Sequence, residues 1–136
     1  EVTVFGELLE QVRHLLQYEG VLVIEGEVSM DEYAGALKVV AKQILPLAQA
    51  RNQYCKGLEL TLPVSLGLRG VHELTEWLQA HRAAPDQSGA HLRFRVQHPA
   101  AQALLQGSSS WRVNLSDALL RGLRQRLDGT GVQVLY

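Results

Sequence analysis

The sequence predicts an α+β protein, with helices on one face of a mixed or antiparallel sheet. Apolar residues recur at helical spacing in some segments, and alternate or form β-branched runs in others. The helical segments are residues 7–17, 71–81 and 117–127, and the extended ones are residues 21–28, 37–44, 58–62, 91–97 and 132–136. A chain of 136 residues, 46% of them hydrophobic, is long enough for one ordinary domain or two small ones.

The first part of the chain is predicted as β-α-β-β. An extended start at residues 2–5 precedes the helix of residues 7–17, whose apolar side chains form a single stripe. The strands at residues 21–28 and 37–44 flank a loop of turn-forming residues at 29–35. Two strands around such a loop predict a hairpin.

A domain boundary is predicted near residues 48–57, where Pro46 and a polar stretch interrupt the apolar pattern. The chain is then divided into a first domain of residues 1–50, a linker of residues 51–57 and a second domain of residues 58–136.

The second domain is predicted as β-α-β-β-α-β. Residues 100–106 fit either a short strand or a helical turn, and residues 111–115 are extended. Ser116 has the residue type of a helix N-cap, and Gly129 can end the last helix before the final strand.

Motifs for catalysis are missing from the sequence. The histidines lack metal-ligand spacing, no phosphate-binding glycine loop is present, and no serine lies in a nucleophile motif. Cys55 is the single cysteine, which agrees with a reducing compartment, and no base is identified beside it. We therefore expect no catalytic residue, no metal and no cofactor in this chain.

One acidic pair leaves an alternative open. Glu25 and Glu27 are predicted on one face of a strand, and with Asp31 they are compatible with a small metal-dependent hydrolase. The competing interpretation is a solvated strand face.

Charge and hydropathy restrict the partners. Residues 1–56 carry eight acidic and five basic side chains, and residues 57–136 carry six acidic and eight basic ones, all of the latter arginine. This imbalance is too small for strong nonspecific nucleic-acid binding. No apolar run has the length of a membrane span and no signal peptide begins the sequence, so we expect a cytoplasmic protein without a membrane partner.

Some residues are suited to binding another molecule. Trp111 follows three serines and precedes Arg112, and Trp and Arg are residue types that dominate interface energies. Trp111 fits an exposed anchor and a core residue equally well.

Several segments together resemble the C-terminal region of the bacterial DNA polymerase III alpha subunit. They are VIEGEVSMDEYAGALK at residues 23–38, Ala50-Arg51, Trp111-Arg112-Val113, Ser116-Asp117 and Leu119-Leu120. The resemblance runs over essentially the whole chain. It implies the last part of an OB-fold followed by a domain that docks the tau subunit of the clamp loader, with the polymerase's catalytic residues upstream of this segment.

The resemblance also implies two groups of binding residues. For tau docking they are Trp111, Arg112, Val132, Val134, Leu135 and Tyr136, and for single-stranded DNA they are Tyr33, Lys38 and Lys42. Val132 and Val134 also fit a purely structural role in the core, and the two lysines fit a soluble strand edge. The alternative function is an independent OB-type module that binds single-stranded nucleic acid.

The first domain departs from a complete OB-fold, which needs five strands. Only the end of the third strand, the helix and the last two strands are present, so the barrel cannot close. Because open strand edges pair with other strands, we expect this part to dimerise, swap elements or cover itself with the second domain.

Overall fold

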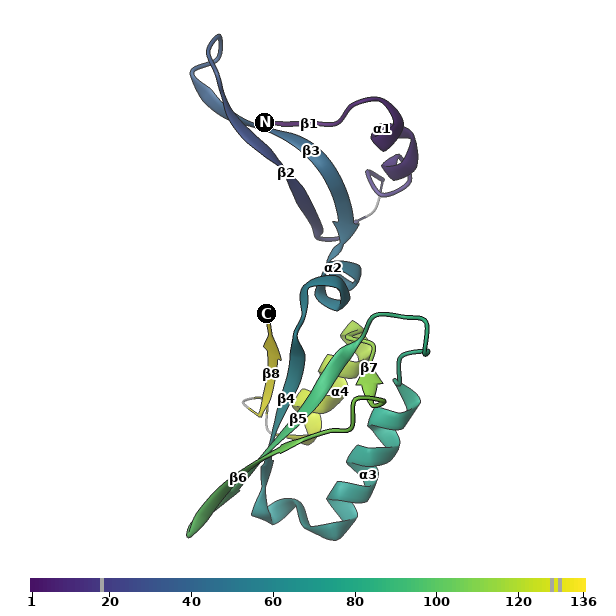
Figure 1. The fold of residues 1–136 in the computed structure, drawn as a ribbon, viewed down its shortest axis with the longest axis vertical. Coiled ribbons are helices and arrows are strands. Elements are labelled where there is room, and N and C mark those ends of the chain that lie inside the picture. Colours follow the sequence, from purple (N-terminus) through teal and green to yellow (C-terminus); the bar gives the residue numbers. More distant parts are fainter. Residues whose placement is uncertain (18, 128, 130) are drawn as a thin grey trace. The chain divides into compact units, whose positions relative to one another are not determined.

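The computed structural model describes residues 1–17, 19–127, 129 and 131–136 and divides the chain into two compact units. Unit 1 is Glu1–Ala50 and unit 2 is Arg51–Tyr136, and Figure 1 shows both. Helix α2 (Leu47–Tyr54) spans the division. Residues 51–54 of the predicted linker (51–57) are therefore helical.

Unit 1 is a three-stranded sheet with one helix. It contains β1 (Val2–Thr3), α1 (Gly6–Val12), β2 (Leu22–Asp31) and β3 (Ala36–Pro46). Strand β3 is central, antiparallel to β2 and parallel to β1, which confirms the hairpin and agrees with a truncated, open OB-like fold. The predicted loop at 29–35 shortens to a turn at 32–35, because β2 continues to Asp31.

Helix α1 is shorter than the predicted helix of residues 7–17. The backbone N–H groups of Leu15 and Leu16 both donate to the carbonyl of Val12, so the regular ladder of helical hydrogen bonds ends there. Leu15 still packs against the small core of unit 1, which explains why the apolar stripe extends beyond the helix. The buried members of that core are Val12, Ala41 and Ile44.

A bulge in β3 fixes the register of the hairpin. Gly26 pairs with Ala41 and Glu25 pairs with Gln43, so Lys42 is the extra residue. A Cβ atom on Gly26 would lie 2.2 Å from the carbonyl oxygen of Val40, a separation that no side chain tolerates. Glycine is therefore required opposite the bulge.

Unit 2 contains a mixed sheet with two long helices. Its elements are β4 (Gly57–Pro63), the 3₁₀ helix η1 (Val64–Leu66), α3 (Gly67–Ala80), β5 (Ala90–His98), β6 (Ala101–Gln106), β7 (Arg112–Val113), α4 (Asp117–Arg126) and β8 (Val132–Leu135). The main strand order is β6-β5-β4-β8, and β7 pairs with β5. Strands β4 and β5 are parallel and the other pairs antiparallel, so the predicted α+β class and mixed sheet are confirmed.

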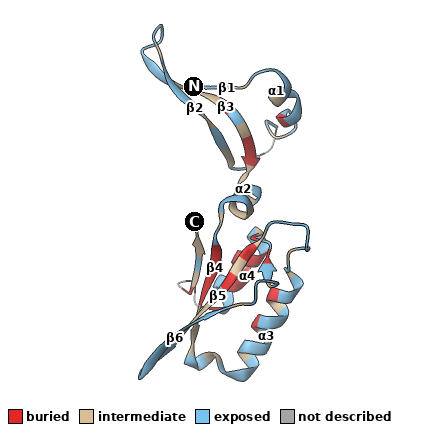
Figure 2. Cartoon of the chain, in the orientation of Figure 1, coloured by how far each residue is buried: buried red, intermediate tan, exposed pale blue. Residues whose placement is uncertain are grey.

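The core of unit 2 lies between one face of this sheet and both helices. Leu58, Leu60 and Leu92 from the sheet are each at most 1% exposed. They share a core cluster with leucines of α3 and α4, as the buried segments in Figure 2 show. The opposite face is polar, and there Arg95 donates to Glu59 at 2.8 Å.

The ends of α4 follow the sequence signals. The Ser116 hydroxyl accepts a hydrogen bond from the backbone of Leu119 at 3.1 Å, which confirms the predicted N-cap. Gly129 has a φ of 71°, a left-handed conformation that favours glycine after a helix.

Glycine in the middle of α4 makes room for a tryptophan of α3. A Cβ on Gly122 would lie 2.4 Å from the ring of Trp77. The guanidinium of Arg126 lies 4.3 Å from the centroid of that ring, so the indole is held between α4 groups.

We predict that Gly122→Ala lowers the free energy of unfolding of unit 2 by about 1 to 3 kcal/mol, because overpacking a rigid ring outweighs the better helix propensity of alanine. Urea unfolding followed by tryptophan fluorescence measures this, since both tryptophans lie in unit 2. Gly70→Ala is the matched control: its Cβ would meet only the flexible side chain of Leu66. Equal destabilisation by both substitutions would contradict this packing argument.

An ion pair at the start of α4 makes the stability of unit 2 depend on pH. Arg51 donates a hydrogen bond to the carboxylate of Asp117, and this contact holds the pKa of Asp117 below its usual value. Such a carboxylate stabilises the fold above its unfolded pKa of about 3.9, and the contribution is lost as the pH falls through the lower folded pKa.

We therefore expect Asp117→Asn to lower the urea midpoint at pH 7, and its effect to shrink as the pH falls through the lowered pKa of Asp117. Asp86→Asn, in the exposed loop before β5, is the control. A difference that persists undiminished at low pH would show that Asp117 acts other than through its charge.

Candidate functional site

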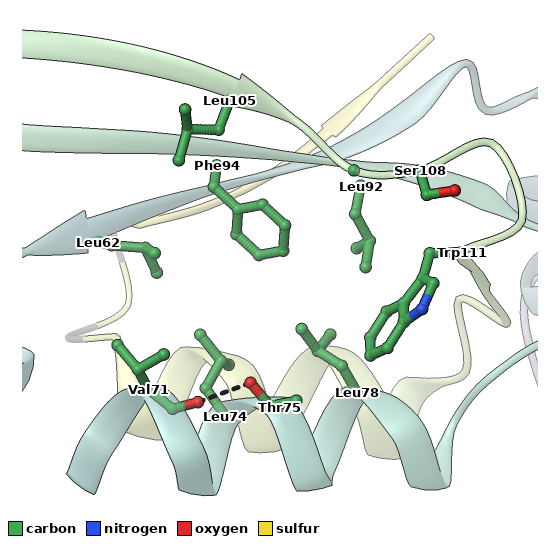
Figure 3. A pocket seen from close by; sticks show the side chains of 11 residues that line it. Leu62, Val71, Leu74, Thr75, Leu78, Leu92, Phe94, Leu105, Ser108 and Trp111 are labelled. Carbon is green, nitrogen blue, oxygen red and sulfur yellow. Dashed lines mark hydrogen bonds between the residues drawn. The ribbon is translucent and has the colours of Figure 1, made fainter. Parts of the chain in front are cut away.

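An apolar groove opens on the surface of unit 2. It has a volume of about 400 Å³ and lies between α3 and the strands β4, β5 and β6 (Figure 3). Its lining residues are Leu62, Val71, Leu74, Thr75, Leu78, Leu92, Phe94, Leu105, Gly107, Ser108 and Trp111. The Thr75 hydroxyl donates to the carbonyl of Val71 at 2.8 Å, so this polar group is satisfied within the helix. The groove thus offers mainly apolar contacts.

The groove is open on the side of strand β6. Phe94 of β5 pairs with Leu105 of β6, so both side chains face α3, whereas the next residue, Leu104, faces the polar side of the sheet. Leu104 and Leu105 are each 54% exposed. Strand β6 is an edge of the sheet, and Leu105 is one wall of a groove that the helices leave uncovered.

Trp111 forms one end of the groove. Its backbone N–H donates to the carbonyl of Ser108, which closes the preceding serine turn, and the N–H of Gly107 joins this turn to the Leu92 carbonyl of β5. The indole packs against the core cluster and also lines the groove, so it combines the two roles that the sequence left open. The guanidinium of Arg82 lies 5.8 Å from the ring centroid.

A second, more polar hollow lies beyond Trp111. It has a volume of about 600 Å³. It is lined by Arg82, Ala83, Ala84, Pro85, Gln87, Ser109, Ser110 and Arg112. Arg112 is therefore close to Trp111 in space as well as in sequence.

The remaining residues predicted for tau docking lie elsewhere. Val132 and Val134 pair with Leu60 and Leu58 and pack against the core, in the structural role that was their alternative. Leu135 pairs with Gly57 on the opposite face, and Tyr136 is 62% exposed. Strand β8 and strand β6 are opposite edges of the sheet, so the structure does not bring the predicted residues into one surface.

Sequence reasoning missed most of the groove. Phe94 lies in the predicted strand of residues 91–97, and Leu105 lies in the segment left open between strand and helical turn. The signal that separates them from ordinary core residues is the uncovered edge strand, which is a property of sheet order.

The residues predicted for single-stranded DNA lie on the hairpin of unit 1. Tyr33 is fully exposed in the turn. Lys38 lies 4.0 Å from a carboxylate oxygen of Asp31, and Lys42 donates to Glu27 at 2.5 Å. Both lysines thus share their strand face with carboxylates, and the salt bridge lowers the pKa of Glu27. Unit 1 carries eight acidic and three basic residues.

Groups for metal or nucleophilic chemistry are not assembled in the described part of the chain. Among residues 1–17, 19–127, 129 and 131–136, no cluster of three His, Cys, Asp or Glu side chains is suited to a metal ion. Asp31 instead accepts backbone hydrogen bonds from Tyr33 and Ala34, which lower its pKa. No described helix is both long and apolar enough to cross a membrane.

The fold and the site together define a two-unit α+β protein with an apolar groove beside exposed arginines. Comparison with known proteins shows which protein the chain resembles. The chain is similar along its whole length to a segment of the bacterial DNA polymerase III alpha subunit, as the sequence predicted.

It is 31% identical over 137 residues to this subunit of Escherichia coli O157:H7 and 32% identical over 138 residues to that of Pseudomonas aeruginosa. Both matches cover 100% of the chain, and the chain spans only 12% and 11% of the length of these relatives. The subunit of Neisseria meningitidis is 33% identical over 98% of the chain. No family model matches the sequence.

Cys55 is poorly suited to nucleophilic chemistry. Burial raises the pKa of its thiol, and Sγ donates to the carbonyl of Asn52 at 3.7 Å. Since the thiolate is the reactive form, we expect iodoacetamide to alkylate Cys55 more slowly in the folded chain than in urea at pH 8. Mass spectrometry of timed samples measures both rates. Faster alkylation in the folded chain would reveal an activated thiol.

Proposed function

We propose that this chain is a non-catalytic, C-terminal segment of a replicative DNA polymerase alpha subunit, and that unit 2 docks the tau subunit of the clamp loader. The similarity to DNA polymerase III alpha subunits along the whole chain supports the first part. The parent protein is then a cytoplasmic DNA-directed DNA polymerase, a transferase whose catalytic residues lie outside this segment.

The groove of unit 2 carries the second part of the proposal. Apolar surface in a groove is the usual site for anchoring side chains of a partner, and Trp and Arg are the residue types most often found at the centre of such sites. Trp111 ends the groove and Arg112 lies beside it. Docking through this surface needs no movement of the buried core.

Strand β8 offers a second contact for tau. Its outer edge and Tyr136 are positioned to accept a partner strand, whereas Val132 and Val134 already pack on the core. The groove is the better candidate of the two, because Val71 and Leu105 in its lining are exposed.

Contact of unit 1 with single-stranded template stays a prediction. Tyr33 is exposed enough to stack on a base. The acidic balance of unit 1 and the carboxylate partners of Lys38 and Lys42 oppose binding of a polyanion. The open sheet of unit 1 keeps dimerisation through this unit as a further prediction.

A matched pair of leucines tests the groove. We expect Leu105→Ala to weaken binding of the C-terminal domain of tau by roughly fivefold, and Trp111→Ala by roughly thirtyfold, because both remove apolar contacts from the lining of the groove. Leu104→Ala is the control, since Leu104 has the same exposure on the other face of β6. Isothermal titration calorimetry with the 136-residue chain measures the affinities.

Deletion of Leu135 and Tyr136 tests in the same titration whether β8 contacts tau.

For the groove, an equal loss of affinity with Leu104→Ala and Leu105→Ala would show that it is not the docking surface. Failure of the unmodified chain to bind tau at micromolar concentrations would contradict the proposal as a whole.

A further inference from the structure

Positive charge without a carboxylate partner gathers at the Trp111 end of the groove. Arg82 and Arg112 are exposed and line the same hollow. Within the described residues neither forms an ion pair, whereas Arg51, Arg69 and Arg95 each bind a carboxylate. No acidic side chain is among the described residues that line the hollow. Two guanidinium groups are thus available to an external anion.

The net charge of unit 2 also favours an anionic partner. Unit 2 carries ten basic and six acidic residues, whereas unit 1 is acidic. A net positive unit attracts acidic partners and raises their association rate.

Trp111 joins the apolar and the basic surfaces. Its indole lines the groove, its neighbours Ser110 and Arg112 line the hollow, and Arg82 donates to the carbonyl of Ser110 at 3.1 Å. The apolar groove and the hollow with its two arginines are therefore neighbours, and Trp111 lies between them. A ligand that fills both must carry apolar groups next to negative charge.

We propose that the groove and the hollow together bind an acidic peptide segment with an apolar anchor, whose apolar side chain enters the groove beside Trp111 and whose carboxylates pair with Arg82 and Arg112. This inference rests on the proposed docking function of the groove, and it specifies the chemistry of the partner segment. Guanidinium groups bind carboxylates through two parallel hydrogen bonds, which fixes the direction of the segment. A nucleic acid would satisfy the arginines but leave most of the apolar lining in water.

Three labelled peptides of about ten residues test the proposal. They share two leucines and one phenylalanine, and the other positions are glutamate in the first, glutamine in the second and lysine in the third. Fluorescence anisotropy with the 136-residue chain should show the glutamate peptide binding about tenfold more tightly than the glutamine peptide, and the lysine peptide more weakly than both. The preference should shrink as salt concentration rises.

Single substitutions assign the preference to the two arginines. Arg112→Gln and Arg82→Gln should each weaken binding of the glutamate peptide about threefold or more and leave the affinity for the glutamine peptide unchanged. A general loosening of the fold would weaken binding of both peptides. Arg112→Gln is the cleaner variant, because Arg82 also holds the serine turn. Arg93→Gln is the control: Arg93 pairs with Gln106 on the polar face of the sheet.

Equal affinities for the glutamate and glutamine peptides would overturn the inference. A single-stranded oligonucleotide that binds through the same arginines more tightly than the glutamate peptide would overturn it as well. Tau binding that is weakened by Leu105→Ala but not by Arg112→Gln would overturn it and leave tau docking intact. Binding of the glutamate peptide by a chain that does not bind tau would support the inference and contradict tau docking.

Discussion

The leucine layer between the sheet and the two helices of unit 2 is the constraint on which the rest of this structure depends. Leu58, Leu60 and Leu92 are almost fully buried, and each such side chain contributes about 1.5 to 3 kcal/mol relative to an exposed one. The layer places β4 at the centre of the sheet and both helices on one side of it. It also ends before β6, whose residues are all exposed. The same packing that stabilises the fold therefore leaves an apolar edge uncovered, and the groove is a direct consequence of it.

The groove and the hollow beside it offer two kinds of interaction. In the proposed complex, Phe94, Leu105 and Trp111 would supply apolar contacts. Arg82 and Arg112 would supply direction and selectivity for negative charge. Unit 1 has the opposite character, with acidic side chains beside its lysines. A docking role thus fits the chemistry of unit 2 better than nucleic-acid binding fits that of unit 1.

Local signals in the sequence predicted most of the elements. Ser116 and Gly129 mark the ends of α4 because caps and left-handed glycines act within a few residues of chain. The hairpin of unit 1 follows from two β-branched runs around a turn. One expectation was wrong in extent: the first helix ends at Val12, although its apolar stripe continues through a turn that packs on the same core. Residues 51–54 of the predicted linker are helical although their composition is polar. In both segments the type of side chain indicates whether a residue is buried or exposed, but not whether its backbone is helical.

The sequence by itself determined the α+β class, the similarity to the DNA polymerase III alpha subunit, and Trp111 and Arg112 as binding candidates, and it left the sheet of unit 2 open between mixed and antiparallel. Tertiary structure alone decided which other residues join them. Alternating side chains predict that Leu104 and Leu105 face opposite sides, but not which side meets a helix. Likewise, Val132 and Val134 look like free apolar strand residues until β8 pairs with β4 and turns them onto the core. A binding surface is defined by which strands lie at the edges of a sheet, and that order depends on contacts between residues far apart in the chain.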